Sequence, residues 1–217
     1  MAAREAGVFY SRLFEFKVGK DKASFTVHAT AIARLSDALN KLINGSMKEA
    51  LEGKAVFDDV ERDTFERICQ FAYTGDYTAH GNYCNMEHAN QQQQQQHHGQ
   101  HHGQHHGQPL RLSHAKAYVF AEKWGAEALK ALALAKLRTT LETFTLYEAR
   151  QGDIIELLRY AYSDEHLPDR DYLRNLVLLY AVDKIKSLIH TSEWLSLIKE
   201  GGTFAAELAV ALASRIR

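Results

Sequence analysis

Alternating hydrophobic and polar residues near the start of the chain predict a β-hairpin. The run LFEFKV at residues 13–18 is rich in β-prone apolar side chains and ends at Gly19-Lys20. In SFTVH at residues 24–28, Phe25 and Val27 alternate with polar residues. This alternation is typical of a strand with one buried face. Two antiparallel strands are therefore expected to open the fold.

The pattern then changes to a helical period. Apolar residues recur every three or four positions from Ala29 to Asn44, where Asn44-Gly45 is a stop signal. Ser36-Asp37 lies inside this stretch and is expected to cap its second half, which gives two short helices. Residues 54–60, KAVFDDV, predict a third strand, and residues 63–73 place their apolar side chains on one helical face. The first block is therefore predicted to be α+β.

A low-complexity segment follows this block. Residues 91–108 are a glutamine run followed by a four-residue repeat of histidine, glycine and glutamine, without an apolar side chain. Such a segment cannot offset its chain entropy by burial and is predicted to be disordered. Periodic patterning stops at Tyr77 and resumes near His114. Residues 81–109 are therefore interpreted as a loop insertion between two blocks that pack on each other.

Helical patterns fill the chain after the insertion. Ser113 is predicted to cap a helix that reaches Trp124, and Gly125 separates it from a second helix over residues 126–141. Residues 142–217 are predicted to be helical as well.

The remaining helix signals lie in that last part. Asp153 and Glu156 resemble a capping box, and Pro168 suits the first turn of a further helix. Two apolar stretches, at residues 194–198 and 204–212, complete the pattern.

Composition and charge narrow the classes of function. Apolar residues make up 46% and charged residues 24% of the 217 residues, which is typical of a folded chain. The 26 basic and 27 acidic residues leave a formal net charge of -1, so no general attraction to nucleic acid or to an anionic membrane is expected.

The cellular compartment is inferred from the cysteines and the N-terminus. The two cysteines, Cys69 and Cys84, are too few for a disulfide framework and are not spaced as a metal-binding pair. The start of the sequence has no apolar segment of the kind that a secretory signal needs, and no run approaches ~18 apolar residues. An intracellular protein, in the cytoplasm, the nucleus or both, is therefore expected.

Several short motifs follow one another in a recognisable order. They are FTVH at residues 25–28, Ser36, MKEA at 47–50, DV at 59–60, FAYTGDY at 71–77, and AKAYVFAEKWGAEALKALALAKL at 115–137. In this order they resemble the BTB/POZ domain in its fungal form, over residues 11–141 apart from the insertion. The resemblance implies a small mixed sheet flanked by helices, followed by an all-helical extension at residues 142–217. Residues 1–10 are expected to be a flexible N-terminus.

The sequence departs from the family at two points. Many BTB domains carry an acidic residue just before the first strand, where this chain has Arg12. In animal transcription factors that residue contributes to a dimer pocket for corepressors. The N-terminal segment is also short for the exchanged elements of the animal dimers. The resemblance therefore leaves the oligomeric state open, with a homodimer as one alternative.

The resemblance also indicates residues that would bind a partner. Met47-Lys48-Glu49 has the hydrophobic-x-Glu form through which many BTB adaptors contact a cullin scaffold. In that contact the apolar side chain fills a groove and the carboxylate fixes the register. Tyr73 would then be a second anchor, since tyrosine offers a large contact area with a polar tip. The alternatives are local packing for Met47 and Glu49 and a position at the edge of the core for Tyr73.

The histidines and the Asp58-Asp59 pair are expected to have structural roles or none. His28 follows a strand and is expected to bond to the backbone. The histidines at positions 97, 98, 101, 102, 105 and 106 have a spacing that could bind a metal if the loop were ordered, but a short-repeat expansion is the favoured explanation, since nothing in the segment would fix a defined geometry. Asp58-Asp59 is predicted to cap the next helix. No metal site and no cofactor is therefore predicted.

The sequence is compatible with three functions. The sequence contains no G-x-S-x-G, H-E-x-x-H, G-x-x-x-x-G-K-[ST] or G-x-G-x-x-G motif, so an enzyme is not expected. The favoured hypothesis is a substrate adaptor that brings a target to a cullin-type ubiquitin ligase. The alternative is a homotypic scaffold or a transcription-associated interaction protein without a ligase. Metal handling by the histidine tract is the third.

Overall fold

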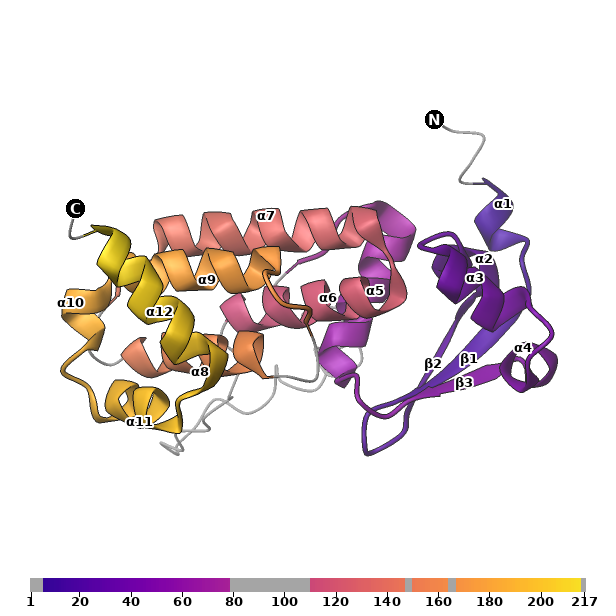
Figure 1. Ribbon diagram of the computed structural model, residues 1–217. Helices are drawn as coiled ribbons and strands as arrows, with labels where there is room; N and C mark the ends of the chain where they lie inside the picture. The colour runs from indigo at the N-terminus through magenta and orange to yellow at the C-terminus, as the bar shows by residue number, and fades with distance from the viewer. Residues whose placement is uncertain (1–5, 79–109, 147–149, 164–166, 216–217) are drawn as a thin grey trace, which may run out of the picture.

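The computed structural model describes residues 6–78, 110–146, 150–163 and 167–215. A small sheet and its short helices form one end of an elongated molecule, and longer helices form the middle and the other end (Figure 1). The strands are β1 (Leu13–Val18), β2 (Ala23–His28) and β3 (Lys54–Phe57). The helices are α1 (Ala6–Phe9), α2 (Ala29–Ala33), α3 (Asp37–Asn44), α4 (Lys48–Glu52), α5 (Arg62–Thr74), α6 (Leu110–Trp124), α7 (Glu127–Thr143), α8 (Gln151–Tyr162), α9 (Tyr172–Asp183), α10 (Ile185–Leu188), α11 (Ser192–Glu200) and α12 (Gly202–Arg215).

The sheet has the strand order β2-β1-β3 and is mixed. β1 and β2 form the predicted antiparallel hairpin, with Phe14 opposite Val27 and Phe16 opposite Phe25. β3 is parallel to β1. A parallel neighbour requires a crossover connection, which α2, α3 and α4 supply. The predicted α+β class and the three predicted strands are confirmed.

Aromatic side chains join the sheet to α5. Phe65 of α5 lies between three rings of the sheet, with centroid distances of 5.0 Å to Phe16, 5.1 Å to Phe25 and 5.9 Å to Phe57. Tilted and edge-to-face pairs at these distances are favourable beyond the area that they bury. Phe16 and Phe65 are fully buried. This cluster fixes α5 against one face of the sheet.

Local capping explains the division of residues 29–44 into two helices. The Ser36 hydroxyl accepts a hydrogen bond from the Leu39 amide at 3.1 Å, in an extended backbone conformation typical of an N-cap. The predicted cap is confirmed. α3 also ends at Asn44, as the Asn44-Gly45 signal predicts.

Two predicted caps in the helical half are wrong. α6 begins at Leu110, so Ser113 lies inside the helix, fully buried, with no hydrogen-bond partner for its hydroxyl. α8 begins at Gln151, so Asp153 lies in the first turn, where its charge favours the helix dipole without capping it. In both cases the helix begins before the polar residue that suggested its start.

The predictions for Pro168 and for Asp58-Asp59 are also wrong. Pro168 precedes α9, whose first turn starts at Tyr172 and is capped by Asp171. The N-cap position of α5 is Glu61, without a side-chain cap. Asp58 pairs with Lys22, and Asp59 pairs with Lys123 of α6. These aspartates therefore form ion pairs with distant segments instead of capping the helix that follows them.

The C-terminal helices share a core with the first block. Buried apolar side chains form a cluster that extends from Val8 to Leu208. α6 contacts α8, and α7 contacts α9, which lies beside it along the molecule (Figure 1). None of the helices in the described part of the chain has the length and apolar character needed to cross a bilayer. The predicted insertion at residues 81–109 lies outside the described residues, and residues 6–9 form α1.

Candidate protein-interaction site

Met47 and Glu49 lie at the start of the short helix α4, at the outer end of the sheet. Met47 is the N-cap residue, and its carbonyl oxygen accepts hydrogen bonds from the Ala50 and Leu51 amides at 3.1 and 3.2 Å. Gly53, with φ at 69°, ends the helix in the left-handed conformation that favours glycine. The Met47 side chain is 57% exposed, whereas Glu49 is half-buried. The segment that carries the hydrophobic-x-Glu motif is therefore largely helical.

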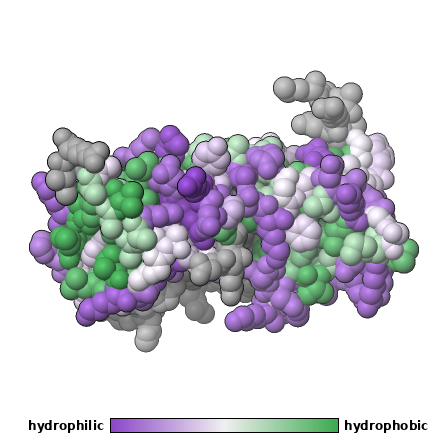
Figure 2. All heavy atoms as spheres, viewed as in Figure 1, coloured by the Kyte–Doolittle hydropathy of each residue, from purple (hydrophilic) through white to green (hydrophobic). Residues whose placement is uncertain are grey.

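A second exposed apolar residue lies on the same helix. Leu51 is 81% exposed and lies four residues after Met47, the N-cap residue of α4. Figure 2 shows hydrophobic atoms at this end of the molecule, over α4. The sequence pattern did not single out Leu51, because an isolated leucine in a polar stretch is common on protein surfaces.

Arg12 connects the start of β1 to the segment that carries Met47. One of its terminal nitrogens donates to the Ala50 carbonyl at 3.1 Å, and the other donates to the Ile43 carbonyl at the end of α3. Its guanidinium group lies 5.6 Å from the centroid of the Phe14 ring. A planar guanidinium can hold two carbonyl groups at once. Arg12 thus bridges both sides of the Met47 turn.

Tyr73 lies on the last turn of α5, at the opposite side of the sheet, and is half-buried. Its hydroxyl accepts a hydrogen bond from the His28 amide at 2.9 Å and bonds to His28 Nδ1 at the same distance. The Phe9 ring stacks on it at 6.5 Å. The Tyr73 hydroxyl, which is expected from the sequence to face a partner, is therefore hydrogen-bonded to His28 of the same chain. His28 is structural, but its ring bonds to Tyr73 and not, as predicted, to the backbone.

The predicted partner-binding residues lie on two separate surfaces. Across the described residues, no hydrogen bond, ion pair or ring contact joins Tyr73 to Met47 or Glu49. The strand order explains this separation, because α4 leads into β3 at one edge of the sheet and Tyr73 bonds to β2 at the other. Met47, Glu49 and Leu51 form one candidate surface, which is called the α4 surface here. Tyr73 belongs to a groove beside β2.

Buried titratable groups elsewhere pair with one another. The Tyr118 hydroxyl of α6 donates to Asp171 at 2.8 Å, and burial followed by this bond raises the pKa of Tyr118. The Tyr162 hydroxyl donates to Glu207 at 2.6 Å, and its pKa is raised for the same reasons. Within the described residues, no group of three or more metal-ligating side chains converges. The histidine tract lies outside those residues.

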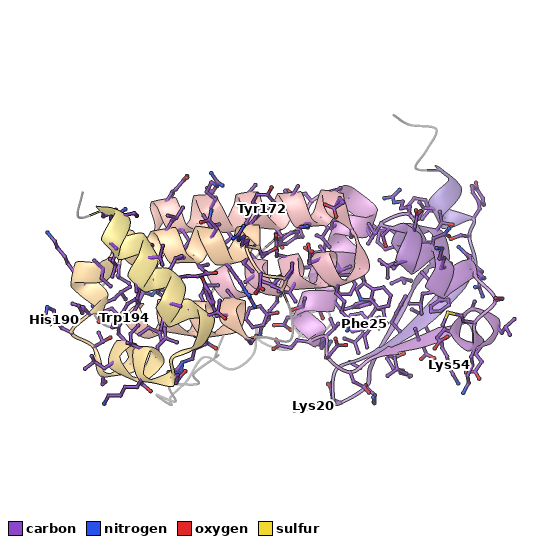
Figure 3. All side chains as sticks on the ribbon, viewed as in Figure 1. Lys20, Phe25, Lys54, Tyr172, His190 and Trp194 are labelled. Carbon is purple, nitrogen blue, oxygen red and sulfur yellow. The ribbon has the colours of Figure 1, made fainter. Side chains whose placement is uncertain are left out.

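Replacing Arg12 with methionine is expected to lower the free energy of unfolding by about 1 kcal/mol, because two charge-assisted bonds are lost at a largely exposed position. Amide hydrogen exchange at Ala50 and Leu51 should become faster, and chemical denaturation gives the stability. Lys20→Met removes another exposed cation, which points into solvent (Figure 3), and should change neither quantity. Unchanged exchange in the Arg12 variant would show that the Met47 turn is held without this bridge.

Comparison of the chain with protein-family models finds no match, and comparison with curated proteins finds none either.

Proposed function

We propose that the chain is a protein-interaction module with a BTB-type fold that brings a target protein to a cullin-type ubiquitin ligase. The observation that supports this most is the α4 surface. An apolar side chain, Met47, is exposed at a turn that Arg12 bonds from both sides, and a carboxylate follows two residues later. A pre-organised apolar anchor lowers the entropy cost of association.

The proposed mechanism is proximity. Binding of the scaffold at one end of the chain and of a target elsewhere raises the effective concentration of the target at the ligase. The chain itself then needs to supply no chemistry. Its elongated shape places the helices α8–α12 far from α4, so the two binding events would not compete for one surface (Figure 1).

Met47→Asp is expected to weaken binding to a fungal cullin by at least tenfold, because a charge replaces the apolar anchor. Glu49→Lys should weaken it as well. Val210→Asp places the same charge on an apolar residue that is 72% exposed at the other end of the molecule, and it should bind like the parent. Purified proteins and surface plasmon resonance give the affinities.

Two results would contradict the adaptor. The parent chain binding no cullin would exclude the proposed partner. Equal losses in Met47→Asp and Val210→Asp would exclude the α4 surface. Self-association in sedimentation that survives Met47→Asp, without cullin binding, is what the homotypic scaffold predicts instead.

A further inference from the structure

An apolar groove of about 570 Å³ lies between β2 and the second half of α5. This volume is within the range of ~300–1,000 Å³ that is usual for ligand sites. Its apolar wall consists of Phe25, Val27, Cys69, Tyr73 and Tyr77. Figure 3 shows Phe25 extending from the sheet toward α5, into the space between the two elements.

Among the residues that the structure describes, no strand pairs with the outer edge of β2. β2 is terminal in the strand order, and its residues alternate in the direction of their backbone groups. The Ala29 amide donates to Arg12 on the β1 side, whereas the His28 amide donates to Tyr73 on the groove side. By the same alternation, Ser24 and Thr26 direct their amide and carbonyl groups toward the groove side. Both residues are exposed.

β2 also lacks the features that usually protect an edge strand. Natural sheets protect their edges with lysine, proline, bulges or very short strands. β3, at the other edge, has four residues and begins with Lys54. β2 has six residues, ASFTVH, without lysine, proline or glycine, and pairs with β1 without interruption. An edge strand without these features, next to an apolar groove, is the arrangement that strand addition uses.

The charges of the groove favour a basic ligand. Glu66 and Asp76 line it, and no lysine or arginine does. Their cationic partners, Arg62 at 3.2 Å from Glu66 and Lys136 at 2.8 Å from Asp76, lie outside the lining. Burial raises the pKa of the Cys69 thiol to about 12, so this wall carries no thiolate charge at neutral pH. A cationic side chain at the rim would compete with Arg62 and Lys136 for these two carboxylates.

We propose that this groove binds one extended segment of a partner protein, which adds to β2 as a strand. The segment would place apolar side chains at alternate positions against Phe25 and Cys69, and a lysine or arginine toward Glu66 or Asp76. α5 forms the opposite wall of the groove, which favours a single peptide strand over the three-stranded sheet of a second copy. This inference does not depend on the cullin contact at α4.

The test begins with selection from a random heptapeptide library on the full-length chain. The enriched peptides are expected to alternate apolar and polar residues and to contain lysine or arginine. Thr26→Pro should weaken binding of the tightest synthetic peptide by at least tenfold. Proline removes an edge amide of β2 that does not take part in the pairing with β1. Thr26→Val changes the side chain, keeps the amide and should bind like the parent. Fluorescence polarisation gives the affinities, and circular dichroism confirms that both variants fold.

A second measurement leaves the protein unchanged. In an added strand, every second amide of the peptide faces β2. N-methylation of those amides removes the hydrogen bonds from the ligand side and should abolish binding, whereas N-methylation of the other amides should not. Enrichment of no peptide, equal affinities for Thr26→Pro and Thr26→Val, or insensitivity to methylation of both sets of amides would each overturn the proposal. A dimer in sedimentation that Thr26→Pro dissociates would do so too, in favour of a second copy. Cullin binding by Thr26→Pro, measured separately, should equal that of the parent.

Discussion

Replacing Asp171 with alanine is expected to lower the free energy of unfolding by about 3 kcal/mol. Asp171 is 6% exposed and bonds in two directions. One oxygen accepts from the Leu173 amide at 2.6 Å and caps α9, and the other accepts from the Tyr118 hydroxyl of α6 at 2.8 Å. Loss of the cap costs about 1 kcal/mol, and a buried hydroxyl without a partner costs about 2 kcal/mol more.

Asp171→Asn is the matched control. Asparagine also caps helices, and its amide nitrogen can donate to the Tyr118 oxygen, so a loss below about 1 kcal/mol is expected. Urea denaturation measures both variants. The chain has two tryptophans, Trp124 on α6 and Trp194 on α11, so single-tryptophan variants report on each half. A loss for alanine no larger than the roughly 1 kcal/mol of the cap would show that the Tyr118–Asp171 bond does not stabilise the contact between α6 and α9.

Features that depend on neighbouring residues could be predicted from the sequence. The alternation in residues 13–18 and 24–28 gave the hairpin, since the strands are adjacent in the chain and one face of each is buried. Ser36 bonds to an amide three residues away, so its role is local. The helix starts were less predictable, because Ser113 and Asp153 are polar residues that lie inside helices already begun.

Features that depend on distant residues could not be predicted. Tyr118 and Asp171 are 53 positions apart, and only packing of α6 against the later helices brings them together. Arg12 reaches the carbonyls of Ile43 and Ala50, which nothing near Arg12 in the sequence indicates. The same holds for the site. The exposure of Met47 and its position before a carboxylate fit the sequence hypothesis, but the placement of Tyr73 on another surface follows from the strand order.

Lowering the pH from 7 to 5 is expected to reduce the free energy of unfolding by about 2 kcal/mol through the titration of His114 alone. His114 of α6 is 3% exposed, and its Nδ1 atom lies 2.9 Å from the Tyr77 hydroxyl. This contact joins the end of the first described segment, residues 6–78, to the start of the second, residues 110–146. Burial, followed by the charges of Lys136 and Arg67, lowers the pKa of His114 to about 4. The imidazole is therefore neutral in the folded protein at neutral pH.

The sign of the effect follows from the two pKa values. The folded value of about 4 lies below the ordinary value of 6.5, so the unfolded chain binds the proton first as the pH falls. Stability is complete above the ordinary value, decreases between the two values and no longer changes through this group below the folded value. Carboxylates whose pKa is lowered on folding, such as Asp76, add their own loss at more acidic pH.

His114→Asn isolates the histidine from those carboxylates. Asparagine can bond to the Tyr77 hydroxyl but does not titrate, so the variant should lose about 2 kcal/mol less than the parent between pH 7 and pH 5. Urea denaturation at both pH values measures the difference, whatever the stability of the variant at pH 7. Nuclear magnetic resonance titration of His114 gives its folded pKa directly. Parallel stability curves for the two proteins would mean that His114 titrates as it does in the unfolded chain, and that the contact with Tyr77 is open to water.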